Sequence, residues 1–486
     1  AHGFEVIGNW NTLRDNVAED IGLELVVDGA ETHGFHVDGN WNRLRGNTAV
    51  NIGPELDGEF PEDGSFPPEL QFQLDAYGFL ITGSRNRLTD NTAEEIRTGF
   101  FSDQGDGFAL VDADYSWLID NVAEDNGNQG FLLRKDSDGN LLSGNTATNN
   151  PTGFNIGGNA PGSLGFIPLP GGPAPDETSD NNTLRENTTT GYQFGFYVSG
   201  KTEFVPSETC PFCFVQVDTP VVGTIFSSNE AIDPAASNSS FGFGFGAVNT
   251  EGTILQDNYT SNNLANGFEL SQSKNAYVAN NIAWNNAANG FAFTALTISE
   301  VVDNRAVGND EDGFQLSSDV FGGVSSDNLF MQNVALNNTR DGFRLESLGL
   351  ADADRSEPFP WPFEFAGSIA TESNVLEDNL ASWNGGAGFH LLGVSGNILQ
   401  DNTATRNVGD GFRVARLDVF APGFALNAGE LLGSVSSDDN FLAGNSANRN
   451  RGYGFYVDEV LSNLFEDNEA RRNRLGASNQ PGILDG

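Results

Sequence analysis

The chain is poor in positive charge. Its 486 residues include 23 Lys and Arg against 67 Asp and Glu, which gives a formal net charge of -44. The only lysines are Lys135, Lys201 and Lys274. Because binding to phosphate groups needs a basic surface, nucleic acid is excluded as a general partner and an anionic membrane surface is disfavoured. An acidic surface with little lysine is typical of proteins from saline environments, where salt screens like charges. Selection for solubility alone is the alternative.

Long apolar runs and cysteines are also scarce. No segment approaches the ~18 apolar residues of a membrane-spanning helix. No charged segment followed by an apolar one opens the chain, so we expect a signal peptide to be absent or already removed. The two cysteines stand together as Cys210-Pro-Phe-Cys213. A structural zinc site normally takes four ligands, so a disulfide or two free thiols is favoured over an incomplete metal site.

Glycine and phenylalanine are abundant and recur as a pair. A Gly-Phe pair marks fifteen copies of a repeat between Gly3 and Gly454, and it alternates with a second motif, usually Asn-x-Leu-x-Asp-Asn-x-Ala. Where nothing is inserted, one period is 23 residues, as from Gly267 to Gly290. Apolar residues within a period are spaced by two, which indicates strands and not helices. The sequence therefore predicts an all-β solenoid of about 15 coils, with three short strands per coil.

Two residue types should form internal columns of this solenoid. The Phe of each Gly-Phe pair should stack inward, and the Asn that closes each second motif should hold a tight turn and bond the coils on either side. The residues chosen for these columns are Phe108, Phe268, Phe291, Phe314, Phe412, Asn121, Asn258, Asn281, Asn304 and Asn402.

With this repeat the chain resembles the right-handed parallel β-helix proteins of the pectin-lyase-like superfamily, specifically their NosD-like, carbohydrate-binding and sugar-hydrolase branch. The resemblance covers residues 3–486. It implies a single β-helix domain over residues 1–486 and an extracellular or cell-surface location. It implies little about chemistry, because the fold carries lyases, hydrolases, epimerases, adhesins and scaffolds.

Insertions interrupt the period mostly after the Gly-Phe strand. We expect loops at residues 52–77, 94–106, 160–181, 199–224, 317–326, 346–372 and 415–438. Loops on one edge of a solenoid can build a wall beside a strand face and so form a groove for an extended ligand. They can equally pack down on the solenoid or mediate contacts between protomers.

The first outward position after Gly-Phe holds a row of candidate functional residues. The row includes Arg344, His390 and Arg413 on consecutive coils, which should place them about 5 Å apart, and continues to Tyr456. Arginine forks can hold the carboxylates of a uronate chain, and His and Tyr can abstract or donate protons. Substrate contacts are expected from Gln315, Glu346, Trp361 and Phe363. A ladder of surface salt bridges is the alternative interpretation of the row.

Motifs of better-known relatives are missing. We find neither the residue set of polygalacturonases nor the Asp-Pro-His-Asp motif of alginate epimerases, and the pair His33 and His36 is interpreted as incidental. No cofactor is required by the sequence. The carboxylates of Asp136 with Asp138, and of Asp352 with Asp354, lie in turns that could bind Ca²⁺ or another hard cation.

Two functions follow as hypotheses. The first is a secreted or surface β-helix that binds polysaccharide or serves as a structural module without catalysis. The alternative is a polysaccharide lyase or epimerase that acts on a uronate-containing polymer through the Arg344 to Tyr456 row. Because the sequence begins and ends inside a coil, either flanking parts were removed or the solenoid ends pair with another protomer.

Overall fold

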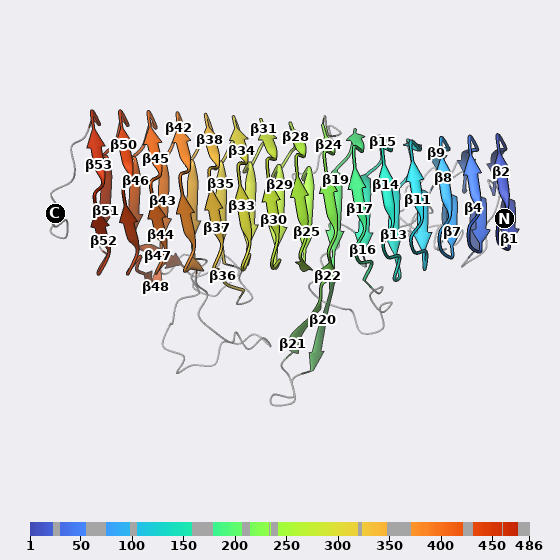
Figure 1. Cartoon of the computed structure of the whole chain (residues 1–486), viewed down its shortest axis with the longest axis horizontal. Helices are drawn as coiled ribbons and strands as arrows, with labels where there is room; N and C mark the ends of the chain where they lie inside the picture. The colour runs from blue at the N-terminus through green and yellow to red at the C-terminus, as the bar shows by residue number, and fades with distance from the viewer. Residues whose placement is uncertain are drawn as a thin grey trace, which may run out of the picture. The chain divides into compact units, whose positions relative to one another are not determined.

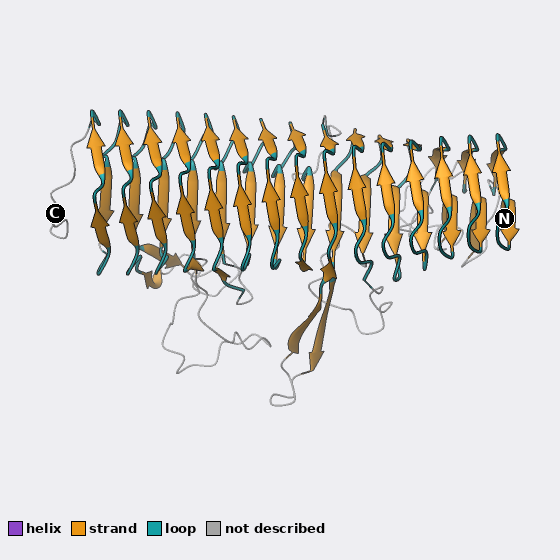
Figure 2. Ribbon diagram, in the orientation of Figure 1, coloured by secondary structure: helices purple, strands orange, loops and turns teal. Residues whose placement is uncertain are grey.

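The computed structural model describes residues 1–22, 30–54, 74–97, 105–157, 178–206, 214–232, 234, 242–318, 323–347, 371–420, 431–458 and 460–474. In this part of the chain every regular element is a β-strand (Figure 2). No helix in it is long and apolar enough to cross a membrane. Three parallel sheets of fifteen strands each follow one another around every coil, as the repeat predicted. We name them the Gly-Phe sheet, the Leu sheet and the Ala sheet after the residues they bury.

The Gly-Phe sheet contains the strand that begins each coil (Figure 1). Its strands are β1 (His2–Ile7), β4 (Ala30–Asp38), β7 (Leu74–Thr82), β10 (Gly105–Val111), β13 (Gln129–Arg134), β16 (Thr152–Gly157), β19 (Phe194–Ser199), β25 (Phe245–Val248), β29 (Phe268–Ser271), β32 (Phe291–Thr294), β35 (Phe314–Ser317), β39 (Phe343–Glu346), β43 (Phe389–Leu392), β46 (Phe412–Ala415) and β51 (Phe455–Asp458).

The Leu sheet contains the second strand of each coil. Its strands are β2 (Thr12–Arg14), β5 (Arg43–Arg45), β8 (Arg87–Thr89), β11 (Trp117–Ile119), β14 (Leu141–Ser143), β17 (Thr183–Arg185), β23 (Ile225–Ser227), β27 (Ile254–Gln256), β30 (Tyr277–Ala279), β33 (Glu300–Val302), β37 (Leu329–Met331), β41 (Val375–Glu377), β44 (Ile398–Gln400), β49 (Phe441–Ala443) and β52 (Leu464–Glu466).

The Ala sheet contains the third strand. Its strands are β3 (Val17–Ile21), β6 (Thr48–Ile52), β9 (Thr92–Ile96), β12 (Val122–Glu124), β15 (Thr146–Thr148), β18 (Thr188–Thr190), β24 (Glu230–Ala231), β28 (Tyr259–Ser261), β31 (Ile282–Trp284), β34 (Arg305–Val307), β38 (Val334–Leu336), β42 (Leu380–Ser382), β45 (Thr403–Thr405), β50 (Ser446–Asn448) and β53 (Glu469–Arg471).

The remaining strands pair two by two outside the three sheets. They are β20 (Lys201–Pro206) with β21 (Phe214–Thr219), β22 (Val221–Val222) with β26 (Thr250–Glu251), β36 (Ser325–Ser326) with β40 (Thr371–Glu372), and β47 (Leu417–Phe420) with β48 (Leu431–Val435). Strands β20 and β21 lie in the predicted 199–224 insertion, and the antiparallel pair β47 and β48 lies in the 415–438 insertion. Parts of the predicted insertions lie outside the described part of the chain, namely residues 55–73, 98–104, 160–177, 207–213, 319–322, 348–370 and 421–430.

The chain divides into two compact units: residues 1–202 with 218–246, and residues 203–217 with 247–486. We call them unit 1 and unit 2. The prediction of one domain over residues 1–486 stays a prediction.

Both units are built around a column of stacked phenylalanine rings. In unit 1 the rings from Phe4 through Phe108 to Phe245 stack with centroids 4.7–4.9 Å apart. In unit 2 the column runs from Phe268 to Phe455 at the same spacing. A parallel sheet repeats at about 4.8 Å, so one ring per coil fills the column without a gap.

The glycine before each phenylalanine is explained by close packing. A Cβ at Gly290 would lie 2.7 Å from Cβ of Ala306 and 2.8 Å from the carbonyl oxygen of Gly313. Hence the coil can close only if this position has no side chain and the facing residue of the Ala sheet is small. The Gly-Phe motif and the Ala of the second motif therefore depend on one another.

Asparagine ladders satisfy the buried turns. In unit 2 the Oδ1 atom of Asn304 accepts the N–H of Asn281 at 2.9 Å, and its Nδ2 donates to Oδ1 of Asn333 at 3.0 Å. Two further ladders run through the turns before the Leu sheet and after the Ala sheet, as at Asn374 and Asn384. Of these three ladders, only the first was predicted from the sequence.

Candidate functional site

The outward face of the Gly-Phe sheet in unit 2 presents two columns of side chains. One column holds the residue directly after Gly-Phe and the other holds the residue directly before it. In the first column, the strand register aligns Gln315, Arg344, His390, Arg413 and Tyr456 on β35, β39, β43, β46 and β51. These five predicted residues are thus neighbours on successive coils.

Arg344 is held by carboxylates on both sides. Its Nη2 atom lies 2.7 Å from Oε2 of Glu346, and its Nη1 atom lies 3.5 Å from Oδ2 of Asp341. Gln315 donates from Nε2 to the other oxygen of Glu346 at 2.7 Å. A substrate carboxylate would therefore have to displace an internal partner before Arg344 could bind it. At this residue the geometry matches the salt-bridge interpretation.

His390 forms a dyad with Asp341 from the previous coil. Its Nδ1 atom lies 2.8 Å from Oδ2 of Asp341, whose Oδ1 accepts the N–H of Ala387 at 2.6 Å. Burial alone would raise the pKa of Asp341, but the hydrogen bond and charge of His390 and the N–H of Ala387 hold it below its ordinary value. An ionised carboxylate only accepts hydrogen bonds, so the proton of a neutral His390 lies on Nδ1 and the lone pair lies on Nε2.

The Nε2 atom of His390 is buried and has no hydrogen-bond partner among the described residues. Burying a polar atom unpaired is costly, so such an atom in a native structure calls for an explanation. Together with the Asp341 contact, this is the arrangement of a general base that is oriented by a carboxylate.

Arg413 lies on this face and forms no ion pair with any carboxylate among the described residues. Its guanidinium lies over the ring of Tyr456 with 5.4 Å between Cζ and the ring centroid, and its Nε atom is buried without a hydrogen-bond partner in the described part of the chain. Burial raises the pKa of the neighbouring Asp410, while the N–H of Tyr453 and the charge of Arg413 partly oppose that shift. Desolvation and the hydrogen bond with Asp458 raise the pKa of the Tyr456 hydroxyl.

The second column adds acidic residues that were not predicted from the sequence. Asp312, Asp341 and Asp410 directly precede Gly-Phe and accept backbone N–H groups from the following coil, at 2.7, 2.6 and 2.7 Å. Burial and the charge of Asp341 raise the pKa of Asp312 to about 7. The signal in the sequence is the Asp that replaces Asn directly before Gly-Phe in these coils. Only positions after the motif were predicted to hold functional residues.

Several predicted site residues are not placed in this cluster. Trp361, Phe363, Asp352, Asp354, Cys210 and Cys213 lie outside the described residues. Asp138 accepts the N–H of Asp180 at 2.7 Å, as a member of a turn ladder, and Asp136 is exposed beside it. Cation binding at these two carboxylates stays a prediction.

The same face in unit 1 carries a histidine cluster. His2, His33 and His36 each offer a ring nitrogen within 4.8 Å of the others. His33 is fully buried, and neither of its ring nitrogens has a hydrogen-bond partner among the described residues, although Oε2 of Glu31 lies 3.4 Å from Nε2. Burial lowers the pKa of His33 to about 3, so the ring is neutral, which is the form that binds metals. These three residues could hold a divalent cation such as Zn²⁺.

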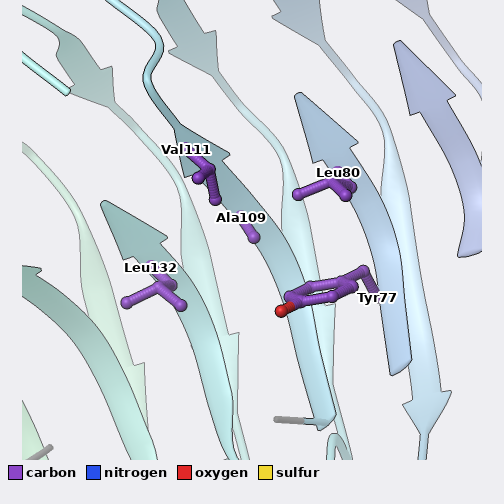
Figure 3. Packing of buried hydrophobic residues seen from close by; sticks show 5 residues of the cluster. All are labelled: Tyr77, Leu80, Ala109, Val111 and Leu132. Carbon is purple, nitrogen blue, oxygen red and sulfur yellow. The ribbon is translucent and has the colours of Figure 1, made fainter. Parts of the chain in front are cut away.

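Further along unit 1 the outward face is closed. Tyr77 and Leu80 of β7 pack with Ala109 and Val111 of β10 and with Leu132 of β13, and all five side chains are buried (Figure 3). Arg134 donates from Nη2 to the hydroxyl of Tyr77 at 2.9 Å. Burial raises the pKa of Asp106 to about 8, although the charge of Arg134 and the hydrogen bonds from Gln129 and Asn128 partly oppose that shift.

Comparisons with known proteins bear on the fold. A model described as "Right handed beta helix region" matches residues 2–210, 223–353 and 369–484. Among solved structures, the A-module of the mannuronan C-5 epimerase AlgE4 from Azotobacter vinelandii is 13% identical, with 92% of this chain and 91% of that chain covered and a TM-score of 0.42. The periplasmic alginate epimerase AlgG is 12% identical over 90% of this chain and 74% of its own, with a TM-score of 0.37.

The catalytic domain of a GH87 alpha-1,3-glucanase bound to nigerose is 13% identical, with 76% of this chain and 61% of that chain covered and a TM-score of 0.40. No curated protein sequence matches significantly. At these identities the structural matches carry no information about the activity of this chain. The family model, in contrast, covers most of the sequence, and the matched residues include strands of all three sheets. This protein therefore belongs to the right-handed β-helix family.

Proposed function

We propose that the protein binds a uronate-containing polysaccharide along the outward face of the Gly-Phe sheet in unit 2. The observation that carries the proposal is Arg413, an arginine without a described carboxylate partner in a chain of net charge -44, aligned with His390 on the next strand. A guanidinium that forms no ion pair with a described carboxylate is suited to a ligand carboxylate. An extracellular or cell-surface location, the NosD-like affiliation and self-association through the solenoid ends remain part of this proposal.

The dyad of Asp341 and His390 favours catalysis as a second candidate function. Nε2 of His390 would take the proton from the sugar carbon beside the carboxylate, whose negative charge Arg413 would stabilise. In a lyase the electron pair of that C–H bond forms a C=C bond, the C–O bond to the neighbouring sugar breaks, and the leaving oxygen takes a proton from Tyr456. In an epimerase no C–O bond breaks, and a proton returns to the same carbon from the opposite side.

The test is incubation with polymannuronate and polygalacturonate. Unsaturated chain ends are followed by ultraviolet absorbance, epimerisation by exchange of the sugar proton in heavy water, and binding by calorimetry. We expect Arg413→Gln to weaken binding by about tenfold or more, since one charge-assisted pair is lost. We expect His390→Gln to abolish any turnover while binding is retained.

Arg406→Gln is the matched control, because the Arg406 guanidinium lies over the ring of Trp383 at 5.1 Å, away from the Gly-Phe sheet. If Arg413→Gln and Arg406→Gln bind the polymers alike, the Gly-Phe face is not the binding site. If the His390→Gln variant still turns over the polymer, His390 is not the catalytic base. If the unmodified protein binds the polymers but never turns them over, its function is noncatalytic binding.

A further inference from the structure

One turn position of the repeat adopts a left-handed backbone in all fifteen coils. It is the third residue before the middle residue of each Leu-sheet strand, and its φ lies between 51° and 69° throughout. In ten coils this position holds glycine or a small polar residue, which are Gly139, Asn181, Gly223, Gly252, Asn275, Asp327, Ser373, Gly396, Asp439 and Ser462. The other five are Trp10, Trp41, Arg85, Tyr115 and Ile298.

The first four coils thus use bulky residues where the turn favours small ones. A side chain with a Cβ is strained at positive φ, and glycine or asparagine relieves that strain. The turn itself gives no reason for Trp, Trp, Arg and Tyr in succession. An unfavourable conformation repeated on consecutive coils points to a role for the side chains.

These four side chains form one exposed stack in unit 1. The rings of Trp10 and Trp41 are parallel within 1° and 5.1 Å apart, and the Arg85 guanidinium lies 5.2 Å from the Trp41 ring and 5.9 Å from the Tyr115 ring. The stack ends at Gly139, where the Tyr115 ring lies 2.7 Å from the place of a Cβ. Backbone hydrogen bonds between successive turns, such as Trp41 N–H to Ser84 O, hold the spacing.

A second row runs beside the stack on the Leu sheet. Register places Arg43 of β5, Arg87 of β8 and Trp117 of β11 on consecutive strands, and the Arg87 guanidinium lies 5.9 Å from the Trp117 ring. The stack and this row line a groove of about 470 Å³ whose other lining residues include Asn42 and Asn86. Because both walls repeat from coil to coil, the groove fits an extended ligand that lies across the strands.

The charges of the groove select an anion. Arg43, Arg85 and Arg87 form no ion pair with any described carboxylate, although acidic residues outnumber basic ones 67 to 23 in the chain. The ring systems remain accessible, with Trp10 70%, Trp41 43%, Tyr115 58% and Trp117 48% exposed. Aromatic rings pack against the apolar C–H faces and edges of sugars, while guanidinium groups bind carboxylates. A nucleic acid is disfavoured by the net charge of -44.

We propose that this groove is a binding site for an extended acidic oligosaccharide, separate from the Gly-Phe face of unit 2. The choice of a uronate as the acidic sugar rests on the proposed function, whereas the presence of a site for an anionic glycan rests on the groove alone. The site would retain a polymer while other parts of the same polymer reach other surfaces.

The experiment introduces residues that other coils already have at the same turn position. Trp41→Asn and Arg85→Asn place at the left-handed turn a residue found there in other coils, so both variants should fold. Ile298→Asn is the matched control, because Ile298 has a φ of 52° at the same position of unit 2 and lies outside the groove. Binding of oligomannuronate and oligogalacturonate hexamers, with a neutral cello-hexaose for comparison, is measured by calorimetry and by tryptophan fluorescence.

We expect acidic hexamers to bind and to perturb the fluorescence, with affinity that falls as salt rises. Trp41→Asn and Arg85→Asn should each weaken binding by about tenfold or more, while Ile298→Asn should bind as the unmodified chain does. A thermal midpoint unchanged or raised in all three variants shows that folding is intact.

If the Trp41→Asn and Ile298→Asn variants bind the acidic hexamers equally well, the groove is not the binding site. The same conclusion follows if no hexamer binds at low salt. If the neutral hexamer binds more tightly than the acidic hexamers, the ligand of the groove is not an acidic oligosaccharide. Loss of binding or turnover in Arg413→Gln alone would place the ligand on the Gly-Phe face and eliminate the groove. Hexamer binding that depends on Trp41 but not on Arg413 would support the groove even as the proposed function fails.

Discussion

At the scale of single residues, aspartate stands directly before Gly-Phe in several coils where other coils have asparagine, a side chain that does not titrate. Asn266 and Asn289 occupy this position in preceding coils and accept the same backbone hydrogen bond, with Asn289 Oδ1 at 2.9 Å from the N–H of Asp312. An amide would serve the turn equally well at Asp312, Asp341 and Asp410. Their carboxylates therefore have a role beyond the turn, and the dyad with His390 supplies one for Asp341.

Asp312→Asn should make the protein more stable at neutral and alkaline pH. The folded-state pKa of about 7 exceeds the ordinary value of 3.8, so folding binds a proton between these values and stability falls as pH rises from about 4 to 7. A gap of this size corresponds to at most about 4 kcal/mol, which the variant should recover above pH 7. Chemical denaturation at pH 4, 6 and 8 measures the difference.

Asp303→Asn serves as the control, because Asp303 is an exposed turn residue of unit 2. If both variants show the same pH dependence as the unmodified chain, Asp312 is not held protonated by its surroundings.

At the scale of elements, each coil depends on turns whose buried amides bond to the next coil. Besides the N–H of Asn281, Oδ1 of Asn304 accepts a hydrogen bond from Nδ2 of Asn281 in the previous coil. Nδ2 of Asn304 lies within hydrogen-bond distance of the carbonyls of Val278 and Val302 and of Oδ1 of Asn333 in the following coil. Phenylalanine stacking and glycine packing fix the spacing of the coils. The ladders then satisfy the polar groups that this packing buries.

Asn304→Ala should destabilise unit 2 by about 3 kcal/mol or more, because it leaves the buried N–H of Asn281 without a partner and removes the side-chain hydrogen bonds to the carbonyl oxygens of Val278 and Val302. Urea denaturation measures the change. Glu300→Ala, on an exposed position of β33 in the same coil, should change stability by less than about 0.5 kcal/mol. Comparable losses in the two variants would contradict the view that the ladder stabilises the coil.

At the scale of the whole molecule, the surface charge is the dominant electrostatic feature. Ion pairs among the described residues are mostly exposed, as between Arg340 and Glu311, and exposed pairs contribute little. With 44 uncompensated negative charges, repulsion opposes the folded state and is weakened by salt. The arginine-lined groove and Arg413 are local exceptions to this field.

The thermal midpoint should rise from low to multimolar sodium chloride, because salt screens the repulsion between carboxylates. Differential scanning calorimetry measures the midpoint, and sucrose at matched water activity controls for effects of solute exclusion. A midpoint that is unchanged by salt, or that rises no more than in sucrose, would contradict adaptation of this surface to a saline environment.

The repeat by itself determined the fold, because the same local pattern occurs fifteen times and each copy packs against a copy of itself. The spacing of Gly-Phe predicted the Phe column and the alignment of Arg344, His390 and Arg413, since parallel strands in register place equivalent positions side by side. Neither prediction required knowledge of contacts between different side-chain types.

Only the tertiary structure decided which outward side chains meet. Asp341 and His390 are 49 residues apart and occupy different positions of the repeat, so a pattern of identical positions could not pair them. The contact of Arg85 with Trp41, which are separated in sequence by an insertion, could not be predicted from the repeat either. Nor could the groove between the exposed stack and the row on the Leu sheet. Periodicity specifies what each coil shares with the next. The contacts that give this chain its chemistry lie where the coils differ, and they form only when the strand register brings those differences together.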